Sequence, residues 1–446
     1  MSITDILRKN GFKIPPRLGI VIGRIPNRYK PFLGKLYQTR RQEIRMFDTL
    51  SDDQKKRFIF SRVKNIVDFA VANVPFYRDY YRQCGFSPEK LETFDELERI
   101  PVISKKILLN YPLEYRTAEC VAKKYVVNTG GSSGHPLSFY IEPSSTAHEW
   151  AHMFTIWEKL GYRPWNAKVH FAGRSDVKNA IEYDFARNSF EVDMYKPFDS
   201  YIHALEKIVR KYKCQYLHGY PSVLYDFAQY CRQHPESRAM LSQYFKGAFL
   251  GSEYPYAHFR EEIERTFGLD TVSWYGHTER CVLAYEKNEK FCYNPFQTYG
   301  FTEVTGEGHL TGTSYYNRAS PLIRYDTEDT VTDFQKEEGL LYSFRLENGR
   351  SGQFITDRQG KNISLTGLIF GRHHRLFDYC SHLQIQQQKP GEATILYVLN
   401  QKLPSDFDPA NLFDTTNVQI DFSFKNLPEP IRTPAGKINI LVKQLP

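Results

Sequence analysis

The pattern of hydrophobic positions predicts that the first 125 residues are mostly helical. Between residues 52 and 72 the apolar side chains recur at helical spacing, with Phe58, Ile59, Val63, Ile66, Val67 and Phe69 on or near one face. This period is typical of an amphipathic helix. Four prolines then interrupt the pattern and predict short helices and loops: Pro75, Pro88, Pro101 and Pro112.

From about residue 125 onward, short apolar runs alternate with helical segments. The runs are Lys124–Val127, Lys168–Phe171, Gln215–Leu217, Gly247–Leu250 and Thr271–Trp274, and the helical segments include Ser145–Leu160, Tyr201–Lys211 and Pro221–Arg232. Beyond Gly306 strand signals dominate, at Leu322–Tyr325, Leu340–Phe344, Thr394–Leu399, Val418–Phe424 and Ile438–Val442. This alternation predicts the α/β class, with a large layered α/β domain. Since single cores stop growing at roughly 250–300 residues, a chain of 446 residues should also contain a smaller domain.

Positive charge is concentrated at the start of the chain. The net charge is +8, yet residues 1–65 contain sixteen Lys and Arg against five Asp and Glu. Interleaved apolar residues make two interpretations equally open for this basic helical arm (residues 1–70). It rests on an anionic membrane surface, or it is a solvated arm or a surface for another subunit. No nucleic-acid recognition module accompanies the charge, so we expect no nucleic-acid partner.

The chain contains no apolar run of the roughly 18–20 residues that span a bilayer, and its N-terminus does not have the order of a signal peptide. We therefore expect a cytoplasmic protein, peripheral to the inner face of the membrane if the arm binds lipid. The seven cysteines are scattered without a CxxC pair. This argues against a disulfide framework and a structural zinc site, and we expect buried or inert thiols.

The sharpest local signal is the segment Thr129-Gly130-Gly131-Ser132-Ser133-Gly134-His135-Pro136, which lies between two short apolar runs. Its glycines permit a tight turn, and its hydroxyl and backbone N–H groups are suited to an anion such as the phosphates of ATP. It is not a Walker loop, because no Gly-Lys-Ser/Thr enters a helix. Alone, such a segment is more often just a turn.

Four further segments follow in order. They are Gly251-Ser252-Glu253, Tyr275-Gly276-His277-Thr278-Glu279, Tyr325-Asp326-Thr327-Glu328-Asp329 and Thr433-Pro434-Ala435-Gly436-Lys437. The ordered set resembles the adenylate-forming superfamily of acyl-CoA synthetases, adenylation domains and luciferases. Asn73–Arg78, Leu97–Pro101 and Leu217–Ser222 make the chain most similar to the phenylacetate–CoA ligase branch, especially its relatives in capsule and O-antigen biosynthesis. The resemblance extends from about residue 70 to the end.

The resemblance implies a role for each segment. Thr129, Ser132 and Ser133, with Gly134, hold the β- and γ-phosphates of ATP. Gly251, Ser252 and Glu253 border the adenine, on which Tyr275 stacks beside Gly276. Thr278 donates to the α-phosphate, Glu279 binds Mg²⁺, Asp329 accepts the ribose hydroxyls, and Lys437 is the mobile catalytic lysine.

The superfamily also has a Gly-Arg pair at the hinge between its two domains, and this chain offers two candidates. Gly349-Arg350 lies 21 residues after Asp329, whereas Gly371-Arg372 leaves a shorter C-terminal domain. We prefer Arg350 as the ribose-binding and hinge arginine. This choice predicts a large domain over residues 1–348 and a small mobile α+β domain over residues 349–446.

The implied activity is ATP-dependent activation of a carboxylic acid to an acyl-AMP with release of pyrophosphate. The acyl group is then transferred to CoA, a carrier thiol or an amine, in keeping with surface polysaccharide biosynthesis. His135 in place of the usual lysine, Glu328 in place of glycine and Gly352 in place of the hinge acid depart from the pattern. His135 and the missing hinge acid leave open an alternative, a catalytically lapsed nucleotide- or acyl-binding protein of the same fold.

Two minor expectations complete the sequence picture. The paired His373 and His374 have no third ligand at metal spacing, so we expect surface or partner contacts rather than a metal. The acid does not follow from the sequence, but His170, Phe171, Tyr220 and Tyr254 are candidates to line its pocket.

Overall fold

The computed structural model describes residues 14–30, 33–129, 137–173, 177, 179–306, 308–346, 354–370, 372, 374–399, 408–431 and 440–442. Its helices are α2 (Pro16–Gly23), α3 (Gly34–Phe47), α4 (Asp52–Asn73), α5 (Pro75–Gln83), α6 (Lys105–Leu109), α7 (Ser145–Glu158), α8 (Ile202–Tyr212), α9 (Pro221–Gln233), α10 (Pro235–Ser242) and α11 (Ala257–Phe267). They include the amphipathic helix expected at 52–72, whose first turn is closed by a capping box between Ser51 and Gln54.

A large sheet has the strand order β10-β9-β8-β7-β6-β3-β5-β4, and its five consecutive strands β8, β7, β6, β3 and β5 are parallel. Its strands are β3 (Lys168–Ala172), β4 (Ile181–Asp184), β5 (Ser189–Asp193), β6 (Tyr216–Gly219), β7 (Gly247–Leu250), β8 (Asp270–Gly276), β9 (Leu283–Tyr285) and β10 (Asn294–Pro295). The carboxyl ends of parallel strands share one edge of the sheet, so the turns after β6, β7 and β8 lie together.

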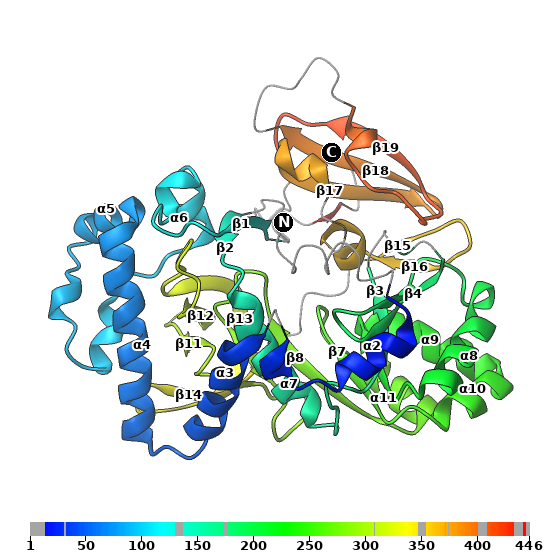
Figure 1. Cartoon of the computed structure of the whole chain (residues 1–446). Helices are drawn as coiled ribbons and strands as arrows, with labels where there is room; N and C mark the ends of the chain where they lie inside the picture. The colour runs from blue at the N-terminus through cyan, green and yellow to red at the C-terminus, as the bar shows by residue number, and fades with distance from the viewer. Residues whose placement is uncertain are drawn as a thin grey trace.

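Alternation along these strands gives the sheet two buried faces. Ala248 and Leu250 belong to a core that includes residues of α8–α11, whereas Phe249 points into a second core that includes α7. Leu217 and Tyr216 on β6 divide between the two cores in the same way. The sheet is therefore covered by helices on both sides, and the α/β class is confirmed (Figure 1).

A second sheet, antiparallel in the order β11-β12-β13-β14, packs with α4 and α5. Its strands are β11 (Gly300–Val304), β12 (His309–Ser314), β13 (Tyr325–Glu337) and β14 (Leu340–Leu346). The strand expected at Leu322–Tyr325 is wrong, because β13 begins only at Tyr325. Arg324, just before it, has a φ of 47° and buries its guanidinium against Glu303 (2.7 and 2.9 Å).

Three smaller units complete the chain: a hairpin of β1 (Tyr125–Asn128) and β2 (Ser138–Ile141), a hairpin of β15 (Phe354–Thr356) and β16 (Asn362–Ser364), and a C-terminal sheet. The C-terminal sheet has the order β19-β18-β17-β20, with β17 (Cys380–Lys389), β18 (Glu392–Leu399), β19 (Asp421–Asn426) and β20 (Leu441–Val442). β17–β19 form the layer at the top of Figure 1. The predicted domain boundary at 348/349 lies outside the described residues and stays a prediction.

The basic N-terminal segment is not a free arm where the structure describes it. On α3, Arg41 binds Thr155 and Glu158 of α7, and Arg40 donates to Tyr316 Oη at 2.8 Å. Both arginines are buried. Part of the positive charge at the start of the chain is thus used inside the fold.

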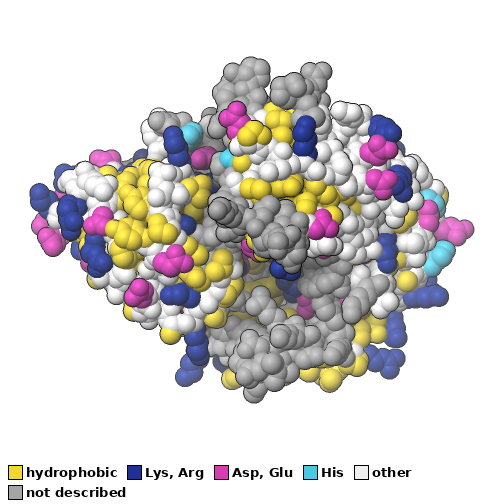
Figure 2. Space-filling view, turned by 90° about the horizontal axis from the view of Figure 1, so that it is seen from above, with side chains coloured by type: hydrophobic (Ala, Val, Ile, Leu, Met, Phe, Trp, Pro, Cys, Tyr) yellow, Lys and Arg dark blue, Asp and Glu magenta, His cyan; other side chains and the backbone are white. Residues whose placement is uncertain are grey.

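The surface seen from above is mixed in character. Figure 2 shows hydrophobic side chains gathered on the lobe formed by α4–α6, with basic and acidic side chains interspersed around its rim. In the described part of the chain, no helix is both long enough and apolar enough to cross a membrane. The cysteines form no disulfide; Cys84 and Cys120 are exposed and so are not buried thiols, and that they are inert stays a prediction.

Candidate functional site

The β1–β2 hairpin presents the glycine- and serine-rich segment. Thr129 pairs with Leu137 across its base: the Thr129 N–H donates to the Leu137 carbonyl at 3.0 Å, and the Leu137 N–H donates to Thr129 Oγ1 at 2.9 Å. Thr129 is buried. Ser132, Ser133 and Gly134 lie outside the described residues, so the structure positions only the base of this segment.

The turn after β7 is closely packed. A Cβ on Gly251 would lie 2.3 Å from Cζ2 of Trp274 on β8, so only glycine fits there. Ser252 has a φ of 67° and is exposed. The carboxylate of Glu253 accepts hydrogen bonds from Ser222 Oγ (2.6 Å) and the Ser222 N–H (3.3 Å), which tie the turn to the start of α9.

Tyr275, at the end of β8, meets Asp329 on β13. The phenol Oη donates to Asp329 Oδ2 at 2.7 Å, although the two residues are 54 positions apart. Burial and the carboxylate charge both raise the pKa of Tyr275, so it remains a donor. Glu328, which replaces the usual glycine, has a φ of 60°, and its N–H donates to Asp326 Oδ1 at 2.8 Å. It therefore keeps the left-handed turn that glycine favours.

Glu279 lies on the turn between β8 and β9, with its carboxylate held on both oxygens. Tyr325 Oη donates to Oε1 at 3.2 Å, and His277 Nδ1 lies 3.0 Å from Oε2. The Val282 N–H donates to His277 Nε2 at 3.2 Å, which places the imidazole proton on Nδ1, toward Glu279. Burial opposes the charge of Glu279, but the His277 hydrogen bond and the nearby Lys105 help to lower the pKa of this carboxyl. Glu279 is therefore ionised at neutral pH.

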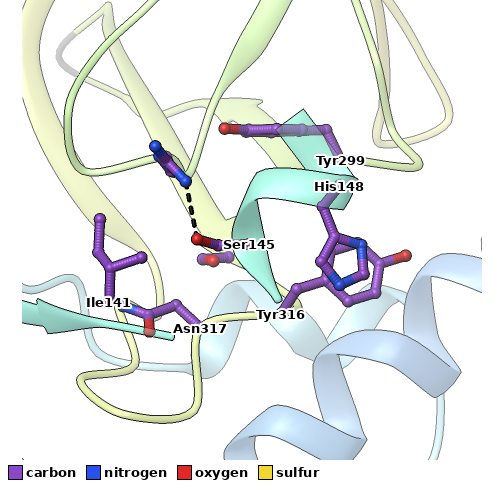
Figure 3. A pocket seen from close by; sticks show the side chains of 8 residues that line it. Ile141, Ser145, His148, Tyr299, Tyr316 and Asn317 are labelled. Carbon is purple, nitrogen blue, oxygen red and sulfur yellow. Dashed lines mark hydrogen bonds between the residues drawn. The ribbon is translucent and has the colours of Figure 1, made fainter. Parts of the chain in front are cut away.

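The neighbours of Glu279 in sequence lie differently. Thr278 is exposed on the same turn, and Gly276 ends β8. Arg280 has a φ of 56°, and its Nη1 donates to Ser145 Oγ at 2.8 Å, at the first residue of α7 (Figure 3). Arg280 thus ties this turn to the helix that follows the β1–β2 hairpin. Sequence reasoning missed it, because nothing in the motif marks that contact.

Arg280 also lines a small pocket beside α7. Its other lining residues are Ile141, Ser145, His148, Tyr299, Ser314, Tyr316 and Asn317. His148 stacks on Tyr316 with ring centroids 3.8 Å apart, and burial lowers the pKa of His148 to about 2 (Figure 3). A neutral imidazole and the cation of Arg280 therefore face the same pocket.

The C-terminal candidates are only partly described. Lys437 and Arg350 lie outside the described residues. Arg372 is buried, with its guanidinium 4.1 Å from the ring centroid of Tyr195 and Nη1 3.0 Å from the Asp414 carbonyl. His374 is buried and stacks on Phe413, so the expected surface position is wrong for this histidine. Its Nε2 lies 2.7 Å from the Leu368 carbonyl, a hydrogen-bond partner inside the protein.

Of the residues suggested for the acid pocket, Phe171 and Tyr220 belong to one core, whereas His170 and Tyr254 contact other groups. Phe171 lies in the core against Phe227, with ring centroids 4.9 Å apart. His170 is half-buried; it stacks on His218 with ring centroids 4.1 Å apart and contacts the buried Glu191. Tyr220 follows β6 and packs against Gly173 and Gly367, and Tyr254 contacts Tyr256 and Phe291. Within the described residues, no group of three His, Cys, Asp or Glu side chains could hold a metal ion by itself.

Comparison with known proteins gives similarity at the level of structure. No family model matches the chain, and a search of curated proteins finds no match. Among solved structures, 2-hydroxyisobutyryl-CoA ligase with 2-HIB-AMP and CoA in the thioesterification state superposes with a TM-score of 0.55 and 18% identity, covering 89% of this chain and 91% of that one. An open conformation of that ligase superposes with a TM-score of 0.53 and 18% sequence identity, covering 89% of this chain and 93% of the ligase. The chain therefore has the fold of this CoA ligase.

Proposed function

We propose that this protein is an ATP-dependent, AMP-forming ligase that activates a carboxylic acid. The observation that carries the proposal is the hydrogen bond between Tyr275 and Asp329, 2.7 Å long. It joins an aromatic ring at the carboxyl end of β8 to a carboxylate on β13, which is the pairing needed to hold an adenine and a ribose together. The ordered motifs and the fold of a CoA ligase support it.

In this proposal the nucleotide lies over the carboxyl ends of β7 and β8. Tyr275 stacks on the adenine, and Gly251, Ser252 and Glu253 border it beside Gly276. Asp329 and Arg350 bind the ribose. Thr129 and the segment that contains Ser132, Ser133 and Gly134 hold the β- and γ-phosphates, using backbone N–H and hydroxyl groups.

Glu279 fits a Mg²⁺ ligand, because it is an ionised carboxylate and Mg²⁺ is usually bound by one or two carboxylates together with substrate phosphates. When bound, the ion supplies positive charge near the phosphates. Thr278 donates to the α-phosphate. Lys437 stabilises the charge that develops as the carboxylate and the α-phosphate join.

The reaction has two steps. A carboxylate oxygen of the acid attacks the α-phosphorus, the bond to the bridging oxygen breaks, and pyrophosphate leaves with that electron pair. An acceptor thiol or amine then attacks the acyl carbon, loses its proton, and releases AMP. Because little covalent chemistry falls to protein groups, positioning and charge stabilisation carry the rate.

The acceptor and the branch are further parts of the proposal. CoA is the first acceptor to test, because structures of the structural neighbour are described in complex with 2-HIB-AMP and CoA. A carrier thiol or an amine remains the alternative. A phenylacetate–CoA ligase-like subtype and a place in polysaccharide biosynthesis rest on the sequence motifs alone.

The test is pyrophosphate release from ATP against a panel of aryl, fatty, hydroxy and amino acids, including 2-hydroxyisobutyrate. We expect release that depends on one class of acid and is lost in Asp329→Ala. If ATP with Mg²⁺ raises the melting temperature but no acid gives pyrophosphate release, the protein binds the nucleotide without catalysis, as the alternative of a catalytically lapsed binding protein predicts. A ligand at 100 times its dissociation constant adds roughly 2.7 kcal/mol to the free energy of unfolding, which is enough to raise the melting temperature measurably.

A further inference from the structure

The helix α2 packs with its small residues inward. A Cβ built on Gly19 would lie 2.4 Å from the Tyr183 ring, and one on Gly23 would lie 3.3 Å from the Asn188 side chain. Both glycines are buried. The two glycines therefore let the helix backbone come close to the β4–β5 hairpin, and this side of the helix, together with Ile20, faces the protein.

Of the four large apolar side chains of α2, Ile20 and Ile22 are half-buried, with Ile20 packed against the core, whereas Leu18 and Val21 face solvent, as does Ile25 just after the helix. Leu18 is 52% exposed, Val21 61% and Ile25 44%. Leu18 and Val21, three residues apart, lie on the same side of the helix, and Ile25 follows two residues after its end. α2 is therefore apolar on two sides: Ile20 packs against the core, and the side that carries Leu18 and Val21 is left uncovered (Figure 1, dark blue, at the front).

Two aromatic residues extend this surface. Tyr29 is 64% exposed, and Trp165, whose backbone lies 3.7 Å from a Cβ built on Gly23, is 48% exposed. Tyrosine and tryptophan are the residues enriched at membrane–water interfaces, where an apolar ring and a polar tip are both satisfied. We call Leu18, Val21, Ile25, Tyr29 and Trp165, with the arginines below, the α2 face.

The charge of the α2 face is of one sign. Arg17, Arg24 and Arg28 are exposed, and no Asp or Glu occurs between residues 14 and 42. The nearest acid of the β4–β5 hairpin turn, Asp184, already pairs with Arg187 at 2.7 Å. Basic side chains around an apolar stripe complement a surface with anionic groups on top and an apolar layer below them, such as an anionic lipid bilayer.

We propose that the α2 face rests on an anionic lipid bilayer, with Val21 and Ile25 in the headgroup–acyl boundary and the three arginines at the phosphates. A second copy of the chain is the less suitable occupant. A twofold interface would bring the same patch of both copies together and place arginine against arginine. A bilayer instead offers the opposite charge and an apolar layer at once.

The experiment uses the full chain with vesicles that contain phosphatidylserine and, separately, with vesicles of phosphatidylcholine alone. We expect co-sedimentation with the anionic vesicles only, weakening as salt rises through physiological strength. Tryptophan fluorescence should shift to the blue on binding, and this shift should vanish in Trp165→Phe. No binding to anionic vesicles, or equal binding to both kinds, would overturn the proposal.

Variants test whether vesicle binding depends on the α2 face rather than on exposed apolar or basic residues anywhere on the protein. Val21→Asp with Ile25→Asp should abolish binding, whereas Phe334→Asp, at a side chain of similar exposure (44%) on β13, should not. Arg24→Glu should weaken binding at least fivefold, on the scale of roughly fivefold for each basic residue near the surface, and Arg238→Glu on α10 should leave it unchanged. If Val21→Asp converts a lipid-free dimer to a monomer, the face belongs to a second copy and the bilayer assignment is wrong.

Discussion

The hydrogen bond between Tyr275 and Asp329 allows the ribose assignment to be tested against its structural alternative. Asp329→Ala removes both the acceptor for the ribose hydroxyls and the partner of Tyr275. Tyr275→Phe breaks the same 2.7 Å bond but leaves the carboxylate and the aromatic ring in place. The two variants therefore share the loss of one protein contact and differ in the loss of the nucleotide contact.

The magnitudes differ enough to be measured. Hydrogen bonds to a charged group contribute roughly 1.5–3 kcal/mol each, so two ribose hydroxyls amount to about 3–6 kcal/mol. At about 1.4 kcal/mol for each factor of ten, Asp329→Ala should raise the Kd for ATP by roughly 10²–10⁴. Tyr275→Phe loses only the protein–protein bond and should raise the Kd by less than about tenfold.

Isothermal titration with ATP and Mg²⁺ measures both variants, and urea unfolding of the apo proteins checks that each is folded. If a folded Asp329→Ala protein keeps its ATP affinity, the ribose assignment is refuted. If its affinity falls only as far as that of Tyr275→Phe, Asp329 acts through Tyr275 and does not touch the nucleotide.

Three further predictions concern packing, catalysis and the hinge. Gly251→Ala should cost about 1–3 kcal/mol in urea unfolding because its Cβ meets the neighbouring indole at 2.3 Å, whereas Gly306→Ala, with no atom within 4 Å, should be neutral; equal midpoints would refute this. Lys437→Ala should slow acyl-AMP formation by roughly 10²–10³ in single-turnover kinetics and spare acyl transfer, so equal losses in both steps would contradict its role. Arg350→Ala should weaken ATP binding and Arg372→Ala should instead lower stability; the reverse would move the domain boundary to Arg372.

The sequence predicted elements well where apolar residues recur at helical spacing or form an unbroken run. The helix expected at 52–72 is α4, and the run Gly247–Leu250 is β7 with the same bounds. It missed β5 (Ser189–Asp193), which is buried at every position although it alternates polar and apolar residues. Glu191 is buried there because His170 and Ser189 satisfy its carboxylate, and that pairing depends on another strand.

In the candidate site, too, the sequence predicted local features but not long-range contacts. The order of the motifs follows from the sequence, as does the chemistry suited to each residue type. The approach of Tyr275 to Asp329, and of Arg280 to Ser145 135 positions away, depends on how two sheets and a helix meet. Local patterns carry no information on contacts of that range, so the positioning role of Arg280 emerges only from the fold.

The buried arginine before β13 has a consequence for how the chain is made. Arg324 donates to the backbone carbonyls of Glu98 and Ile100, and the Tyr77 hydroxyl donates to the Pro321 carbonyl, across 224 to 244 positions. At about 5–20 residues per second, a ribosome needs roughly 10–50 s to supply these partners. During that time the aromatic residues around Tyr77 lack their core. Nascent chains stalled before residue 321 should therefore be cut readily by protease near residues 77–100, and chains stalled well after residue 346 should resist; equal sensitivity would show that the N-terminal segment folds without waiting.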